Sequence, residues 1–248
     1  MPPLIIIPAR MASTRLPGKP LADIAGRPMI VHVADRARAA ALGEVVVAAA
    51  EPEIAAAVEA AGVRVVLTDP ALPSGSDRVH AAAEAVDPHG RHTVIINLQG
   101  DLPVFDPSDL RQALVALDGS DADVGTIAAP IRDADEAASP SVVKIACALQ
   151  PEDIGTDRAV RALYFSRSSI PANTGPLWHH VGVYAWRRSA LRRFVTLPPS
   201  TLERRESLEQ LRALEDGMSV GCAAIANAPF GVDTPADLER ARRALAAS

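Results

Sequence analysis

The chain has 248 residues, of which 48% are hydrophobic and 3% aromatic, and its formal net charge is −5. This length can bury one substantial core, and the aliphatic bias favours helices packed on a sheet over an aromatic-rich β-sandwich. Lys and Arg are scattered without a basic run, so we expect no nucleic-acid partner.

The cysteines and the N-terminal residues narrow the class of protein further. Cys147 and Cys222 lie far apart in the sequence, inside apolar segments and without Cys-x-x-Cys spacing, which argues against a zinc site and predicts two buried thiols. The apolar run at residues 4–7 follows no basic segment and is too short for a signal sequence or a membrane span. We therefore expect a cytoplasmic protein with no membrane insertion.

The first half of the chain alternates two kinds of pattern. Short β-branched runs predict strands at residues 4–7, 45–47, 63–67 and 93–97. Amphipathic stretches between them predict helices at residues 29–41, 53–61 and 77–86. Because helices between strands connect parallel strands, this order predicts a doubly wound, mostly parallel sheet in an α/β fold.

The second half is less regular. Strands are predicted at residues 124–130, 142–149 and 180–186. Helices are predicted at residues 189–195 and 203–215. This mixture predicts a mixed-sheet extension or a small subdomain.

The last helix has a clear start signal in Thr234-Pro235-Ala236-Asp237. Thr234 suits the N-cap position, Pro235 suits the first turn, and Asp237 completes a capping-box-like pair. Asp233 then lies just outside the helix, where its carboxylate is available for another role.

A loop with three cations follows the first predicted strand. The stretch P-A-R-M-A-S-T-R-L-P-G-K-P contains Arg10, Arg15 and Lys19. Open α/β sheets bind ligands beyond the carboxyl ends of their strands, and a triphosphate needs fixed cations and backbone donors. The loop is not a Walker A loop, because Ser13 stands where a Gly is required and Pro20 follows the Lys. A solvated basic loop is the alternative interpretation.

Two acidic residues suit a metal site. Asp101 follows Gly100 at the carboxyl end of the fourth predicted strand, and Asp233 precedes the last helix. If both reach the ligand edge of the sheet, they leave coordination positions open for phosphate oxygens and water, as Mg²⁺ prefers. The alternatives are an ordinary turn residue at Asp101 and an ordinary helix-entry residue at Asp233.

Several ordered motifs carry a family resemblance. The stretch from Pro8 to Leu21 closely resembles the signature of 3-deoxy-manno-octulosonate (Kdo) cytidylyltransferases, also called CMP-Kdo synthetases. The resemblance continues in R-P-M-I-V-H-V at 27–33, S-G-S-D-R at 74–78, Q-G-D at 99–101, A-L-Y-F-S-R at 162–167, H-V-G-V-Y at 180–184, L-E-Q-L-R at 208–212 and V-D-T-P at 232–235. Ordered motifs at matching spacing make the resemblance specific.

The resemblance implies one nucleotidyltransferase domain over residues 1–248, with the fold of nucleotide-diphospho-sugar transferases. Residues 1–120 would mainly bind CTP. Residues 121–225 would form a smaller mixed α/β portion for sugar binding and dimerisation, and residues 226–248 would carry the metal-ligand turn and the last helix. The implied enzyme is a cytoplasmic homodimer that uses Mg²⁺ and CTP to activate Kdo for lipopolysaccharide biosynthesis, by attack of the anomeric hydroxyl on the α-phosphorus with release of pyrophosphate.

The resemblance also implies roles for individual positions. Asp101 and Asp233 match the metal ligands, and Arg10, Lys19 and Asp101 match the catalytic residues. The positions that match the CTP site are Arg10, Ser13, Arg15, Lys19, Ser74, Gly75 and Arg78. The positions that match the sugar-acid pocket are Gln99, Arg167, His180, Tyr184, Glu209 and Gln210. A guanidinium such as that of Arg167 suits a carboxylate, which neutral sugars lack.

Three departures from the family pattern bear on the sugar. Leu102 stands where members commonly have Glu, and Ala50 ends an Ala-Ala-Ala stretch where they commonly have Ala-Thr-Asp. The segment 171–179 is also shorter than expected. These departures keep open the same chemistry on a substituted Kdo, or on another sugar acid such as sialate.

Two alternatives come from other classes. The Asp-x-Asp pairs that begin at Asp121 and Asp133 imitate the metal motif of glycosyltransferases, although both lie among turn residues. An inactive nucleotide-binding module is the other alternative, because Leu102 and Ala50 replace acidic residues of the family pattern.

Overall fold

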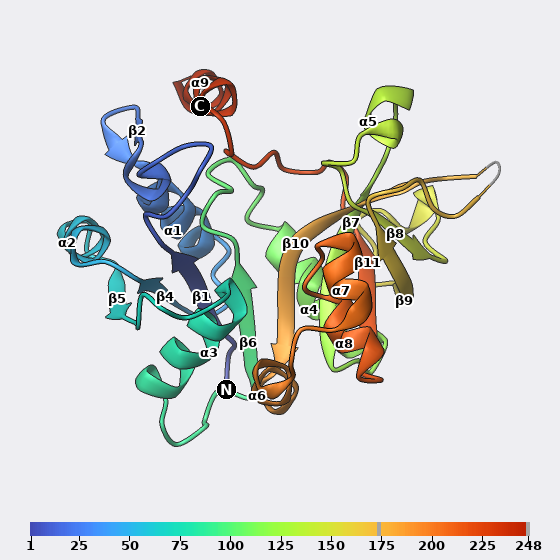
Figure 1. Cartoon of the computed structure of the whole chain (residues 1–248), viewed down its shortest axis with the longest axis horizontal. Helices are drawn as coiled ribbons and strands as arrows, with labels where there is room; N and C mark the ends of the chain where they lie inside the picture. Colours follow the sequence, from blue (N-terminus) through green and yellow to red (C-terminus); the bar gives the residue numbers. More distant parts are fainter. Residues whose placement is uncertain (173–174, 247–248) are drawn as a thin grey trace. The chain divides into compact units, whose positions relative to one another are not determined.

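The computed structural model describes residues 1–172 and 175–246 and divides into two compact units (Figure 1). The first unit comprises Met1–Ser108 and Pro229–Ser248, and the second comprises Asp109–Ala228. The sequence-based division at residue 120 falls instead at the end of helix α4 (Asp109–Gly119). That helix packs on the second unit's sheet, where its backbone fills the space beside Gly125 and Gly221.

The first unit contains the predicted parallel sheet. Its strands are β1 (Leu4–Ala9), β4 (Glu44–Ala49), β5 (Arg64–Leu67) and β6 (Val94–Leu98), in the order β5-β4-β1-β6. The pairs β1–β4, β4–β5 and β1–β6 are all parallel, which confirms the prediction. Strand order reverses between β1 and β6, so their carboxyl ends flank the position where such sheets bind ligands.

Helices connect these strands close to the predicted positions. They are α1 (Met29–Ala39), α2 (Pro52–Ala60) and α3 (Gly75–Val86). Right-handed crossovers put α1 and α2 on one face of the sheet and α3 on the other, since chain direction across the sheet reverses after β5. The 3-10 helix η1 (Lys19–Leu21), the hairpin of β2 (Asp23–Ile24) and β3 (Arg27–Pro28), and helix α9 (Pro235–Ala246) complete the unit.

The second unit has a mixed sheet, as predicted. Its strands are β7 (Val124–Pro130), β8 (Lys144–Cys147), β9 (Ala159–Ser166), β10 (Trp178–Arg187) and β11 (Val220–Ala224), in the order β10-β7-β11-β9-β8. β7 and β11 pair in parallel, and the other neighbours pair antiparallel. His179 of β10 also pairs with Lys144 of β8, so the last strand of this order contacts the first.

The remaining elements of the second unit are short. They are α5 (Ala134–Ala138), the 3-10 helix η2 (Pro151–Asp153), α6 (Arg188–Thr196), α7 (Thr201–Glu206) and α8 (Leu211–Glu215). The prediction of one helix over 203–215 is wrong. Ser207 adopts a left-handed conformation with φ 55° and ends α7, because a residue with positive φ cannot continue a right-handed helix. The prediction of strands missed β9 and β11, and that of helices missed α4.

Three further sequence predictions concern the cysteines, a membrane span and the segment 171–179. Cys222 is fully buried as expected, but Cys147 is only partly buried because it ends strand β8. In residues 1–172 and 175–246, no helix combines the length and the apolar character needed to cross a bilayer. Residues 173–174 of the shortened 171–179 segment lie outside the described residues.

Candidate active site

The cationic loop after β1 folds back on itself and brings Lys19 to the sheet edge. The backbone N–H of Gly18 donates to Met11 O at 3.4 Å, and the N–H of Leu16 donates to Ser13 Oγ at 3.3 Å. Gly18 has φ 69°, which glycine adopts without steric cost, and it caps η1. Lys19 is therefore the first residue of a fixed turn.

An apolar cluster holds two separate parts of the chain at this edge. Ile24 and Met29 pack with Val232, Leu238 and Ala241, and Leu16 of the cationic loop packs against the same cluster. The N–H of Val232 also donates to Asp101 O at 2.9 Å. The segment that carries Asp233 is thus fixed beside Lys19 and Asp101, although it lies far along the chain.

The start of α9 orients Asp233 as predicted. The Asp237 carboxylate accepts from the N–H and the hydroxyl of Thr234, at 2.9 and 2.7 Å, and from the N–H of Asp233 at 3.2 Å. The N–H of Asp237 in turn donates to Thr234 Oγ1 at 3.2 Å. This capping arrangement satisfies the first N–H groups of the helix and leaves the Asp233 carboxylate outside it.

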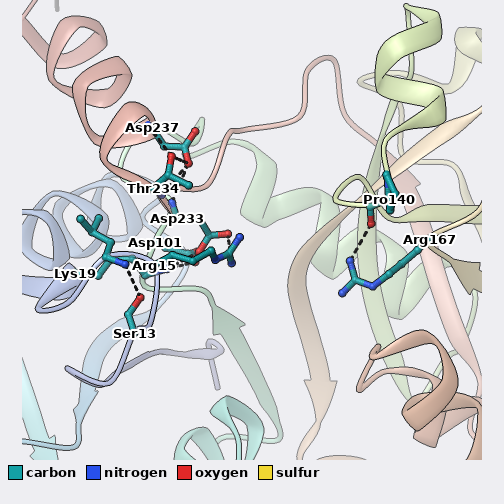
Figure 2. A network of polar contacts seen from close by, with 10 residues as sticks. Ser13, Arg15, Lys19, Asp101, Pro140, Arg167, Asp233, Thr234 and Asp237 are labelled. Atoms are coloured by element: carbon teal, nitrogen blue, oxygen red, sulfur yellow. Dashed lines mark hydrogen bonds and ion pairs between the residues drawn. The ribbon is translucent and has the colours of Figure 1, made fainter.

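Lys19 bridges the two predicted metal ligands (Figure 2). Its Nζ donates to Asp101 Oδ2 at 2.8 Å and to Asp233 Oδ1 at 3.0 Å. Arg15 contacts the other Asp233 oxygen at 2.9 Å. The structure therefore brings both carboxylates to one cation, within reach of a common small ion.

The Lys19 ammonium is charged in this arrangement. Burial alone would lower its pKa, but attraction to Asp101 and Asp233 and the hydrogen bonds to them outweigh burial and raise the pKa above its ordinary value. Lys19 thus keeps a positive charge that can be redirected to a phosphate.

A cavity of about 400 Å³ opens at the carboxyl ends of β1 and β6. All the residues predicted for the CTP site line it: Arg10, Ser13, Arg15, Lys19, Ser74, Gly75 and Arg78. Gln99 and Asp101 line it as well. Among the described residues of the lining, four side chains are cationic and one is a carboxylate, so the cavity suits a polyanion.

Arg78 lies at the buried side of this cavity, with 2% of its surface exposed. Its Nη1 donates to Thr68 Oγ1 at 2.5 Å and to Asp69 O at 3.1 Å. The pKa of the Arg78 guanidinium is lowered, and burial is the largest cause. Its Nη2 is also buried and has no hydrogen-bond partner among the described residues.

Gly100 allows the turn after β6 to lie against β1. A Cβ at this position would lie 2.8 Å from Pro8 O and 3.2 Å from Ile30 Cδ1. Because real Cβ atoms do not approach a backbone oxygen this closely, a larger residue would displace the turn. Gly100 thereby sets the position of Asp101 relative to the loop after β1.

In the second unit, the structure brings together two residues predicted for the sugar pocket. The ring centroids of His180 and Tyr184 are 5.6 Å apart, and Phe165 packs edge-on against His180 at 4.8 Å. Burial, and then the charge of His179, lower the pKa of His180 to about 3, so its imidazole is neutral. Burial, and then the Glu209 carboxylate, raise the pKa of Tyr184, so its phenol keeps its proton.

Arg167 is engaged within its own unit. Its guanidinium donates to the backbone carbonyls of Glu206 at 2.8 Å, Pro140 at 2.9 Å and Ser207 at 3.2 Å; Figure 2 shows the bond to Pro140. Its guanidinium therefore links its own segment to two others, at Pro140 and at residues 206–207, through backbone carbonyls alone in these bonds. Glu209 and the buried Gln210 lie in the turn between α7 and α8.

A family model described as Cytidylyltransferase matches residues 4–220. A 3-deoxy-manno-octulosonate cytidylyltransferase from Parvibaculum lavamentivorans is 60% identical over 244 residues, covering 98% of this chain and 93% of that protein. The protein of the same name from Rhodospirillum centenum is 57% identical over 243 residues, covering 98% and 93%. The chain belongs to the family of 3-deoxy-manno-octulosonate cytidylyltransferases.

Solved structures agree with this family. A CMP:2-keto-3-deoxy-manno-octonic acid synthetase in complex with CTP matches with a TM-score of 0.88 and 40% identity, covering 100% of this chain and 99% of that one. A UTP-bound UGPase from Acinetobacter baumannii matches with a TM-score of 0.71 at 16% identity, which supports the fold alone.

The departures from the family pattern lie in packed surroundings. Leu102 is buried and would contact a Cβ added at Gly231. Ala50 is buried too, and its N–H donates to Ala9 O at 2.9 Å. Both residues thus place an apolar side chain in packed surroundings.

The Asp-x-Asp pairs serve local structure. The Asp123 carboxylate accepts from the N–H and hydroxyl of Ser219, at 2.8 and 2.9 Å. Asp133 caps α5 by accepting from Glu136 N at 2.7 Å. These contacts give Asp123 and Asp133 local structural roles.

Sequence reasoning missed two residues that contact the cationic loop or a predicted site residue. Glu51 Oε2 accepts from Met11 N at 3.0 Å and anchors the cationic loop; its place after strand β4 was the available signal. Thr126 is buried beside His180, with Oγ1 and Nε2 3.0 Å apart. It is the polar side chain in an otherwise apolar strand, V-G-T-I-A-A-P.

Proposed function

We propose that the protein transfers the cytidylyl group of CTP to the anomeric hydroxyl of Kdo and releases pyrophosphate. The observation that carries this proposal is the Lys19-bridged pair of Asp101 and Asp233 at the edge of a cationic cavity. The relatives with 60% and 57% identity, which bear the name of this activity, support the choice of CTP and Kdo.

The cavity residues account for how the nucleotide would be held. Arg10, Arg15 and Lys19 would neutralise the phosphates, and Gly75, the first residue of α3, lines the same cavity. Arg78 lines the same cavity and would add to its positive charge. Positioning and charge neutralisation would then supply most of the rate, because the phosphoryl oxygens carry the developing charge.

Mg²⁺ fits the residues at this site. Asp101 and Asp233 offer hard carboxylate oxygens that already share one cation, and they would leave positions open for phosphate and water. When bound, the ion would supply charge neutralisation at the reacting phosphate. Lys19 would turn from the carboxylates to the phosphates, and Arg15 would release Asp233.

The second unit supplies side chains suited to a sugar acid. His180 and Tyr184 offer a neutral imidazole and a protonated phenol for hydroxyl groups, and Gln210 offers a side-chain amide. Arg167 would meet the carboxylate by exchanging a backbone carbonyl for it. Kdo is the proposed acid, and a substituted Kdo is the nearest alternative because Leu102 and Ala50 depart from the family pattern.

We also propose that the protein is a cytoplasmic homodimer, as the family resemblance implies. Light scattering on the purified protein should give twice the chain mass of 26.0 kDa. A monomer at all working concentrations would contradict the dimer without touching the proposed reaction.

One assay tests the function. The purified protein is incubated with CTP, Mg²⁺ and a panel of Kdo, an amino-substituted Kdo and sialate, and pyrophosphate is measured. Release with Kdo is the expected result, and the ranking of the panel identifies the preferred acid. CTP binding without release for any acid would indicate an inactive module, and consumption of a preformed sugar nucleotide would indicate a glycosyltransferase.

The carboxylate pair is tested by Asp101→Asn. The amide keeps the size of the side chain but loses the charge that would hold the ion, so we expect pyrophosphate release to fall by about 100-fold or more while the fold is kept. Circular dichroism and the unfolding midpoint serve as the control for folding. Near-normal kcat with ordinary magnesium dependence would exclude the ligand role.

A further inference from the structure

Strand β10 is irregular between the two aromatic residues of the proposed sugar site. It pairs with β7 through Val181↔Ile127 and next through Tyr184↔Thr126, so residues 182 and 183 have no partner in the β7 register. In a regular strand, residues four apart lie about 13 Å from each other. Because the bulge takes two residues out of the register, His180 and Tyr184 lie opposite Ala128 and Thr126, two positions apart on β7. The ring centroids of His180 and Tyr184 are accordingly 5.6 Å apart.

Thr126 fills this bulge from the facing strand. It is fully buried, and its Oγ1 lies 2.9 Å from Val183 O and 3.3 Å from Val181 O. A bulge removes carbonyls from the ladder, and a buried carbonyl without a donor is costly. The Thr126 hydroxyl therefore supplies the donor that the irregular segment of β10 lacks.

The same hydroxyl determines which ring nitrogen of the neutral His180 carries the hydrogen. Thr126 Oγ1 lies 3.0 Å from His180 Nε2, and a hydroxyl has one proton to donate. Because that proton is directed to the two carbonyls, the oxygen accepts from His180, and Nε2 must carry the imidazole hydrogen. Nδ1 is then the acceptor of the neutral ring.

We propose that Thr126 is a positioning residue for the sugar-acid site: it stabilises the bulge that brings His180 and Tyr184 together and holds His180 in its Nε2–H tautomer. This inference deepens the proposed function and rests on it for the role of the two rings. The ligand class is a polyhydroxylated acid, one of whose hydroxyl groups donates to Nδ1 of His180. The pKa of His180, lowered by burial to about 3, keeps the ring neutral at working pH.

The test uses Thr126→Val, which keeps the shape of the side chain and removes its hydroxyl. Long-range ¹H–¹⁵N spectra of labelled protein report the His180 tautomer, with the signal assigned by its loss in His180→Gln. We expect the Nε2–H form in the wild type and a mixture of tautomers in Thr126→Val. The KM for the sugar acid should rise about tenfold, the effect of one misplaced hydrogen bond, while the KM for CTP stays unchanged.

Two matched variants separate positioning from packing. Thr126→Ser keeps the hydroxyl and should retain the wild-type tautomer and KM. Ile127→Val removes one buried methyl group from the next position of β7 and should lower stability without changing either readout.

Several results would overturn the inference. A wild-type His180 with its hydrogen on Nδ1 would do so without any variant, as would an unchanged tautomer in Thr126→Val. An equal rise in KM for Ile127→Val would reduce the effect to core packing. If the wild type releases no pyrophosphate with any sugar acid, the proposed function fails, whereas the tautomer measurement still decides the contact of Thr126.

Discussion

At the scale of single residues, the cavity at the carboxyl ends of β1 and β6 is organised by cations that hold carboxylates. Lys19 contacts both Asp101 and Asp233, and Arg15 adds a second contact to Asp233. Two carboxylates placed together without a cation would repel each other. Lys19 therefore keeps the proposed metal ligands assembled in the protein without nucleotide.

Replacing Lys19 should have opposite effects on metal and nucleotide. In Lys19→Met the two carboxylates lose the ammonium that competes with a metal ion, so we expect Mn²⁺ alone to bind about tenfold more tightly. CTP should bind more weakly, because a cation for its phosphates is lost. Calorimetric titration of the apoprotein with Mn²⁺ and, separately, with CTP measures both effects.

Lys19→Arg is the control, since it keeps the positive charge and should not gain metal affinity. If Lys19→Met binds Mn²⁺ no better than the wild type does, Lys19 is not a competitor at this site. Loss of Mn²⁺ binding in Asp101→Asn would show separately that the ion is bound by the carboxylate.

At the scale of elements, short local devices place the site residues. The capping pair of Thr234 and Asp237 begins α9 and leaves Asp233 outside it. Ser207 ends α7 with positive φ, and its carbonyl accepts from Arg167. The break between α7 and α8 thereby creates the turn that carries Glu209 and Gln210.

The left-handed conformation of Ser207 predicts a stabilising substitution. Glycine adopts this conformation without the steric cost that a Cβ brings, and its greater freedom in the unfolded chain offsets part of the gain. We expect Ser207→Gly to raise the free energy of unfolding by about 0.5 kcal/mol. Chemical denaturation compares it with the wild type.

Ser207→Val provides the opposite control. A β-branched residue is strained at positive φ, so this variant should lose about 1 kcal/mol or more. Both variants keep the carbonyl that Arg167 contacts. Equal stability of the Gly and Val variants would mean that the conformation of residue 207 is not the cause of the break.

At the scale of the whole molecule, buried His180 makes stability depend on pH. Its pKa is lowered from 6.5 to about 3 in the folded protein, first by burial. Below pH 6.5 the unfolded chain binds a proton at this histidine that the folded protein excludes. The free energy of unfolding therefore decreases as the pH is lowered from 6.5 to about 3. The fall reaches at most about 1.4 kcal/mol per pH unit from this residue.

The variant His180→Gln isolates this contribution. It removes the titrating group, so its free energy of unfolding should fall less steeply than that of the wild type between pH 6.5 and pH 4. Denaturation curves collected across this range measure the difference. Parallel curves for the two proteins would mean that His180 is protonated without unfolding.

Much of this architecture was predictable from local pattern. Buried parallel strands are continuous apolar runs, as in Leu4–Ile7, and the first three are each followed by a predicted helix, so the α/β sheet of the first unit could be predicted directly. The positions of Arg10, Lys19 and Asp101 after strand ends predicted a cationic site with a carboxylate. The start of α9 was predictable because capping is a local interaction between Thr234 and Asp237.

Other features were decided only by tertiary structure. Strand β9 has exposed residues such as Arg161 and Leu163 among its buried ones, and its pairing with β8 and β11 outweighs its weak local pattern. The division at residue 108 depends on the packing of α4, and the bulge opposite Thr126 depends on how β10 meets β7.

The three cations of the loop after β1 show the same distinction. The sequence by itself determined that Arg10, Arg15 and Lys19 follow a buried strand and that Asp101 follows another, because strand patterns and turn residues are local. Only the fold decided that Lys19 binds Asp101 and Asp233 together. That contact joins parts of the chain far apart in sequence, and its energy depends on the distance between charges, which no local pattern specifies.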